Sequence, residues 1–189
     1  MDALMNPRRK PVVVSGLFGT LIFIGTEVMF FAGLISAFTI VRAGTLPGLW
    51  PPPDQPRLPA HETLFNTFVL LASGVALAAA FLRYRKGKRA FVPAAVALML
   101  GASFLVLQGR EWVALLSRGL TLTSSPLGSF FYVIVGAHAL HATIACGFLV
   151  AVVAKLYRGI IPAGFFLGAQ AFWYFVVLMW PFIYARVYF

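Results

Sequence analysis

Five long apolar runs constrain what this 189-residue chain can fold into. A helix needs about 20 mostly apolar residues to cross a bilayer. Hydrophobic residues make up 61% of the chain and charged residues 11%, which is outside the range of soluble proteins. The sequence therefore predicts an all-α integral membrane protein, a single five-helix bundle over residues 1–189. The predicted spans are 14–42, 62–83, 90–112, 127–154 and 162–186.

The links between these runs predict the orientation of the bundle. The longest link, 43–61, contains a run of three prolines and is expected to be a surface loop without helix. Cytoplasmic links of membrane proteins are enriched in Lys and Arg. A cytoplasmic N-terminus and an external C-terminus place ten of the 15 basic residues inside. These ten are Arg8, Arg9, Lys10, Arg83, Arg85, Lys86, Lys88, Arg89, Lys155 and Arg158.

Composition argues against several classes of function. The net charge of +10 comes from residues at the ends of apolar runs, so no nucleic-acid partner is expected. The single cysteine, Cys146, lies inside an apolar run, and no zinc or iron–sulfur spacing occurs. The sequence also lacks a phosphate-binding glycine loop and a nucleophile elbow. We therefore expect no catalytic, cofactor-binding or metal site on this chain.

An acidic residue, Glu27, interrupts the first apolar run near its middle. A charge at bilayer depth is costly, so such a residue usually has a partner or a function. His138 and His141 lie near the middle of the fourth run, and Tyr174 near the middle of the fifth. These four side chains are predicted to form one hydrogen-bonded layer that joins the first, fourth and fifth helices. Two interpretations of Glu27 stay open: a purely structural hydrogen bond, or a role in proton handling.

A second polar layer is predicted nearer the outer surface. Asn66 and Thr67 lie at the start of the second run, and Gln108 and Glu111 at the end of the third. Backbone groups are satisfied within each helix, so these side chains need partners from other helices.

Six short segments, in the same order along almost the whole chain, resemble motifs of subunit III of the haem–copper oxidases, the cytochrome c and quinol oxidase group. Each segment is short, but their order across five helices is specific. The matches are Glu27–Phe31 to E-x-M-F-F, Trp50-Pro51-Pro52 to a loop signature, Asn66–Gly74 to N-T-x-x-L-L-x-S-S/G, Gln108–Trp112 to Q-x-x-E-Y/W, Gly128–Phe131 to G-x-F-F, and Gly136–Gly147 to G-x-H-x-x-H…G.

The last helix departs from the family pattern Y-W-H-F-V-D-x-x-W. It keeps Trp173 and Trp180, but Tyr174 stands in place of histidine and Val177 in place of the acidic residue. A phenol still donates and accepts hydrogen bonds, but it cannot carry a positive charge. With five predicted helices, the chain is similar to the shorter bacterial members of the family.

The resemblance implies a non-catalytic subunit that binds no haem or copper. Such a subunit packs against catalytic subunit I, holds phospholipids in clefts and supports proton uptake during oxygen reduction. Haem and copper are expected in partner subunits I and II, and a small subunit IV is a possible further partner. The expected location is the bacterial plasma membrane. Three alternatives stay open: an accessory protein of nitric oxide reductase, a stand-alone proton-coupled transporter and a haem-binding membrane cytochrome.

Overall fold

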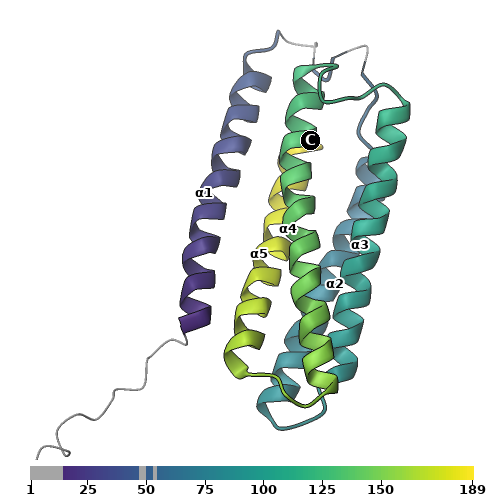
Figure 1. The fold of residues 1–189 in the computed structure, drawn as a ribbon. Helices are drawn as coiled ribbons and strands as arrows, with labels where there is room; N and C mark the ends of the chain where they lie inside the picture. The colour runs from purple at the N-terminus through teal and green to yellow at the C-terminus, as the bar shows by residue number, and fades with distance from the viewer. Residues whose placement is uncertain (1–14, 47–49, 53–54) are drawn as a thin grey trace, which may run out of the picture.

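The computed structural model describes residues 15–46, 50–52 and 55–189, and it is helical throughout its regular parts (Figure 1). No strand occurs within these ranges. All five helices are long and apolar enough to cross a membrane. The predicted all-α fold with five membrane helices is therefore confirmed. The helices are α1 (Ser15–Ala43), α2 (Ala60–Arg85), α3 (Phe91–Ser117), α4 (Pro126–Tyr157) and α5 (Ala163–Val187).

Most helix ends lie close to the predicted bounds, but α3 and α4 extend further than expected at their C-termini. The apolar run of α3 was predicted to end at residue 112, and the helix continues to Ser117. The residues that extend α3, 113–117, are mostly apolar, and the hydrogen-bonded turns of both helices continue until a glycine takes up a left-handed conformation. Gly119 (φ 90°) ends α3 in this way, and Gly159 (φ 68°) ends α4. The left-handed glycine, and not a change in hydropathy, therefore marks where α3 ends.

Helices α2 to α5 form a ring in which each packs against its two neighbours, and α1 lies outside this ring. Among the described elements, α1 packs only on α4 and α5. Figure 1 shows α1 as a separate column beside them. Its buried side chains, Phe31 and Phe38, are seven residues apart and so lie on one stripe of the helix. The remaining faces of α1 are open.

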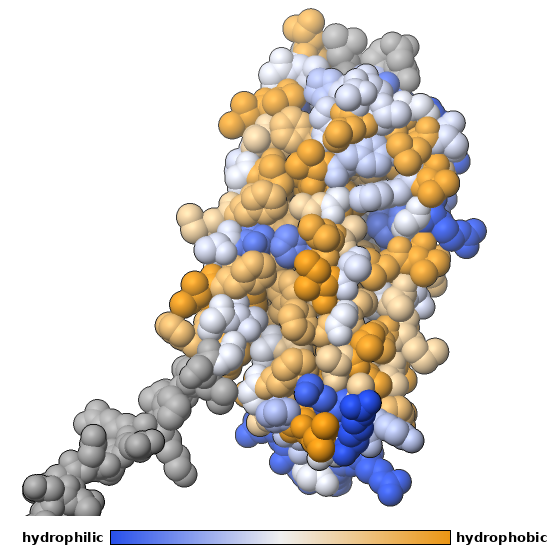
Figure 2. All heavy atoms as spheres, in the orientation of Figure 1, coloured by the Kyte–Doolittle hydropathy of each residue, from blue (hydrophilic) through white to orange (hydrophobic). Residues whose placement is uncertain are grey.

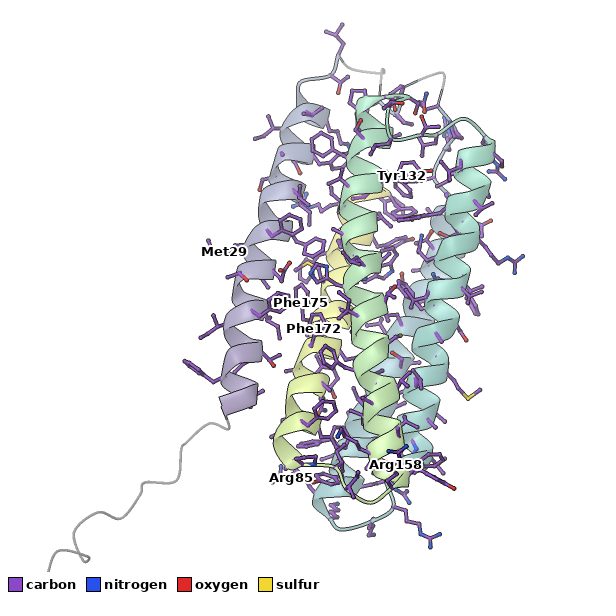
Figure 3. The ribbon with its side chains drawn as sticks, in the orientation of Figure 1. Met29, Arg85, Tyr132, Arg158, Phe172 and Phe175 are labelled. Atoms are coloured by element: carbon purple, nitrogen blue, oxygen red, sulfur yellow. The ribbon has the colours of Figure 1, made fainter. Side chains whose placement is uncertain are left out.

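The two ends of the bundle differ in chemistry. One end, called here the basic end, contains the α2–α3 and α4–α5 links, and blue side chains gather there in Figure 2. Figure 3 labels Arg85 and Arg158 at this end. The opposite end, called the long-loop end, contains the described residues of the α1–α2 link (44–46, 50–52 and 55–59), the α3–α4 link and the C-terminal residues. Arg8, Arg9 and Lys10 lie outside the described residues.

The described part of the proline-rich loop is not helical, as its prolines predict. It folds back on the bundle, because the Trp50 ring lies 5.6 Å from that of Phe38, measured between centroids. Ser124 of the α3–α4 link donates a hydrogen bond of 3.0 Å to Gln55. These contacts connect the loop to both α1 and the α3–α4 link.

Candidate functional site

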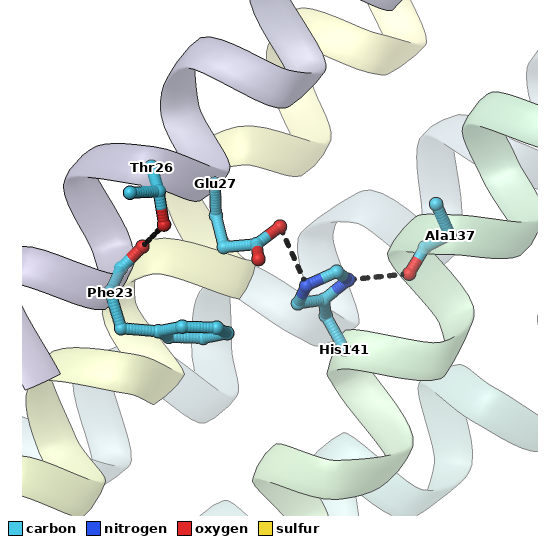
Figure 4. A network of polar contacts seen from close by, with 5 residues as sticks. All are labelled: Phe23, Thr26, Glu27, Ala137 and His141. Atoms are coloured by element: carbon cyan, nitrogen blue, oxygen red, sulfur yellow. Dashed lines mark hydrogen bonds and ion pairs between the residues drawn. The ribbon is translucent and has the colours of Figure 1, made fainter.

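The acidic residue of α1 has a partner on α4. Glu27 Oε2 lies 3.0 Å from His141 Nε2 (Figure 4). The other ring nitrogen of His141, Nδ1, lies 2.7 Å from the backbone oxygen of Ala137, one turn earlier on α4. The side chains of Glu27 and His141 are 18% and 12% exposed, so the pair lies at the edge of the packed interior.

The contact with Ala137 determines which ring nitrogen of His141 carries a hydrogen. A carbonyl oxygen only accepts, so Nδ1 of His141 must carry a hydrogen and Nε2 faces Glu27. A hydrogen bond between Nε2 and Oε2 then requires one proton between them. The proton can belong to an imidazolium beside a carboxylate, or to a carboxyl beside a neutral imidazole. In either state the pair holds one proton and has no net charge, which avoids the cost of a lone charge at bilayer depth.

Aromatic rings surround the imidazole of His141. Phe31 and Phe175 have ring centroids 5.6 and 5.9 Å from it, and Phe23 and Phe172 follow at 6.4 and 6.3 Å. Figure 3 labels Phe172 and Phe175, which extend from α5 into the space between α1 and α4. These rings exclude water from one side of the Glu27–His141 pair.

His141 also borders a large apolar cleft between α1 and the α4–α5 pair, and two of these rings, Phe23 and Phe172, line it. This α1 cleft has a volume of about 760 Å³, within the roughly 300–1,000 Å³ typical of small-molecule sites. It extends from His141 to Pro162 near the basic end. Its lining is almost entirely apolar, with Thr20 and His141 as the main polar side chains; the others include Phe23, Ile144, Phe148, Phe165 and Phe172.

The structure places His138 and Tyr174 outside the Glu27–His141 pair. His138 is buried, and its ring lies against Trp180 with centroids 4.9 Å apart. Neither of its ring nitrogens has a hydrogen-bond partner among the described residues. Tyr174 accepts a hydrogen bond of 2.8 Å from Gln170 on its own helix. The expected four-residue layer is thus reduced to one hydrogen-bonded pair, because packing turns the other two side chains toward different neighbours.

The second polar layer forms a network that joins α2, α3 and the residue after α5. Gln108 is its centre: its Oε1 accepts from Asn66 at 3.2 Å. Its Nε2 donates to Glu111 Oε2 at 3.1 Å and to the hydroxyl of Tyr188 at 3.3 Å. Thr63 donates to the same Glu111 oxygen at 2.8 Å. Burial raises the pKa of the Tyr188 phenol above its ordinary value, so this hydroxyl stays protonated.

Two tryptophans of α5 bond to α2. The indole of Trp180 donates to Thr67 Oγ1 at 2.9 Å, and that of Trp173 donates to Ser73 Oγ at 3.0 Å. Both tryptophans are fully buried. Because they are seven residues apart, both indoles lie on the face of α5 that packs on α2. They fix the rotation and height of α5 relative to α2.

Comparison with known proteins decides the family. The family described as "Cytochrome c oxidase subunit III" matches residues 1–189. Cytochrome c oxidase subunit 3 of Mus musculus is 34% identical over 188 residues, which cover 94% of this chain and 71% of that protein. The protein of the same name from Oryctolagus cuniculus is 33% identical, covering 99% of this chain and 74% of the relative. The chain belongs to the cytochrome c oxidase subunit III family. Members of this family are subunits of a terminal oxidase complex.

In this member of the family, no group of three or more His, Cys, Asp or Glu side chains within the described ranges could hold a metal ion. Several of the described polar side chains instead contact one another across helices, as Glu27 does with His141 and Asn66 with Gln108. The chemistry of these contacts is hydrogen bonding and packing.

Four residues of these polar sites were not predicted from the sequence: Thr63, Ser73, Gln170 and Tyr188. The signal for Thr63 and Ser73 was present, since both lie on the stripe of α2 that also carries Asn66, Thr67 and Leu70. Residues at three- and four-residue spacing share a helix face. Tyr188 follows the last helix in sequence, and its role depends on where α5 places it.

Proposed function

We propose that this chain is the non-catalytic subunit III of a bacterial respiratory terminal oxidase in the plasma membrane, with its basic end in the cytoplasm. It stabilises catalytic subunit I, holds phospholipid and supports proton uptake during oxygen reduction. Haem and copper belong to subunits I and II, and a small subunit IV completes the set of partners. The observation that carries this proposal is the contact of Glu27 with His141 at the edge of a large apolar cleft.

The α1 cleft supports the lipid part of the proposal. Its apolar lining suits acyl chains and offers almost no hydrogen-bonding groups to a polar ligand. Lys155, near the end of α4, lies with Nζ 5.3 Å from the centre of the Phe165 ring, and Phe165 lines the cleft. A cation at the basic end of an apolar cleft suits a phospholipid phosphate, with the acyl chains directed toward His141.

The Glu27–His141 pair supports the proton part. It joins two groups that can each carry a proton, on the border of a cleft that extends toward the basic end. A group in this position can take up and release a proton while the pair stays hydrogen-bonded. A purely structural role of Glu27 predicts the same contact. Only a substitution that preserves the hydrogen bond therefore distinguishes a structural role from a role in proton handling.

Glu27→Gln is that substitution, because its amide can donate to His141 Nε2 but cannot exchange a proton. In the purified oxidase, we expect Glu27→Gln to retain the subunit and the haem content, while proton uptake slows and fewer turnovers precede inactivation. Glu27→Ala should in addition loosen the subunit, at a cost of roughly 1 kcal/mol for one intramembrane hydrogen bond. Thr39→Val is the control on the same helix, because Thr39 is exposed and its hydroxyl bonds only to the backbone oxygen of Ile35 on α1.

Normal proton uptake and durability in Glu27→Gln would leave the pair with a structural role only. Loss of haem in that variant would instead indicate direct contact with a cofactor. Proton-coupled transport by the purified chain alone in liposomes would favour a transporter, and a Soret band from the isolated chain would favour a cytochrome. The metal of the co-purifying partner tests the assembly, since an oxidase contains copper where a nitric oxide reductase contains non-haem iron.

A further inference from the structure

A second hollow lies at the long-loop end, between the start of α2 and the end of α3. This α2–α3 groove has a volume of about 540 Å³ and lies apart from the α1 cleft. The side chains that matter for its chemistry are Glu62, Phe65, Leu107, Arg110, Glu111 and Arg118.

The groove changes from apolar to charged along the helix axes. On α3, Leu107 lies deepest and Arg118 lies just past the helix end, roughly 16 Å apart at 1.5 Å per residue. On α2, Glu62 lies nearer the long-loop end than Phe65. The apolar end therefore points toward the middle of the membrane and the charged end toward its surface. An amphiphilic molecule of the adjacent leaflet has the same polarity in the same direction.

The charges in the groove are not used by the protein itself. Although two arginines and two glutamates line it, no Lys or Arg of the described chain forms an ion pair with an Asp or Glu side chain. Arg110, Arg118 and Glu62 are exposed. Both hydrogen bonds to Glu111 end on Oε2, from Thr63 and Gln108, and Oε1 accepts none from the described residues. Glu111 is thus held in a fixed orientation with one acceptor oxygen free.

These groups define the ligand. Two guanidinium groups suit a phosphate, which they can bind through paired N–H donors. Two carboxyl groups in the same groove suit an ammonium and would repel a headgroup that is only anionic. We propose that the α2–α3 groove binds one phospholipid whose headgroup carries both a phosphate and a primary ammonium. The phosphate contacts Arg110 and Arg118, the ammonium contacts Glu62 and Glu111, and an acyl chain lies along Phe65 and Leu107.

Photocrosslinking in the intact complex tests this assignment. The purified oxidase is placed in phosphatidylcholine nanodiscs that contain phosphatidylethanolamine with a photoactivatable group in its acyl chain. Crosslinked peptides are then identified by mass spectrometry. We expect labelling of the α3 segment 104–118 in the wild type and about tenfold less in Arg110→Gln/Arg118→Gln, since charge-assisted contacts to the phosphate are lost. Arg110→Lys/Arg118→Lys, which keeps both charges, should retain more labelling than the Gln pair.

Two further measurements separate the parts of the proposal. Glu62→Gln should lower labelling by phosphatidylethanolamine to the level of an equivalent phosphatidylglycerol probe, because the ammonium loses a partner. Arg57→Gln removes an exposed loop cation that does not line the groove and should leave labelling unchanged. Equal labelling of the wild type and the Arg110→Gln/Arg118→Gln variant would overturn the proposal. So would an absence of lipid labelling together with protection of Arg110 from a soluble arginine reagent, because another polypeptide would then occupy the groove.

Discussion

Gly101 of α3 tests how closely the helices must approach at the centre of the bundle. A Cβ at this position would lie 2.5 Å from Cη2 and 2.7 Å from Cζ2 of the Trp173 indole. Carbon atoms in good contact lie about 3.5–4.0 Å apart, so Gly101→Ala requires a shift of about 1 Å. The indole cannot give way easily, because it is fully buried and donates a hydrogen bond to Ser73.

The cost of Gly101→Ala follows from these contacts. Overpacking of a well-packed core costs about 1–3 kcal/mol. Displacement of the indole would also weaken its bond to Ser73, and intramembrane hydrogen bonds contribute about 0.6 and at most about 1.7 kcal/mol. We therefore expect Gly101→Ala to lower the free energy of unfolding by about 2–4 kcal/mol. The measurement is titration with sodium dodecyl sulfate in mixed micelles, followed by tryptophan fluorescence.

A double-mutant cycle identifies the indole as the cause. Trp173→Phe removes the outer ring of the indole, including Cη2 and Cζ2, so the methyl group added by Gly101→Ala no longer meets it. Gly101→Ala should cost less in the Trp173→Phe background by about 1–3 kcal/mol, the overpacking term. Gly109→Ala is the control on the same helix, since its Cβ would meet nothing within 4 Å. Additive effects in the cycle, or equal stability of Gly101→Ala and Gly109→Ala, would refute the reasoning.

Two further substitutions test the long-loop end. Gln108→Leu removes the centre of the polar network and should lower the free energy of unfolding by about 2–3 kcal/mol, because buried Asn66 and half-buried Glu111 and Tyr188 each lose a hydrogen-bond partner. Gln170→Leu, which loses a single bond, should cost less than half as much in the same titration. Gly128→Ala should destabilise the α3–α4 link by about 2 kcal/mol or more, since its Cβ would lie 2.2 Å from the backbone oxygen of Thr121. Gly147→Ala on the same helix is the control and should be neutral, because its Cβ would meet nothing within 4 Å. Equal effects within either pair would show that these contacts do not determine stability.

The polar sites show where prediction from sequence succeeds and where it ends. Because a charge in hydrocarbon is costly, Glu27 is predicted to have a partner from another helix. The position of Glu27 along α1 predicts the depth at which that partner lies. His138 and His141 both lie near that depth, one turn apart. Only the packed bundle distinguishes them: His141 meets Glu27, while His138 lies against the Trp180 ring.

The sequence by itself determined that five helices form and roughly where each one crosses the membrane. These are local properties, because a bilayer-length apolar run and the residues at its ends do not depend on distant contacts. The tertiary structure alone decided which side chains meet, as in the bonds of Trp173 to Ser73 and of Gln108 to Tyr188. Successive residues of a helix are rotated by about 100° around its axis, so a neighbouring helix meets only some of them. Which residues it meets depends on the rotation of one helix against the other, and packing over the whole length of the helices sets that rotation.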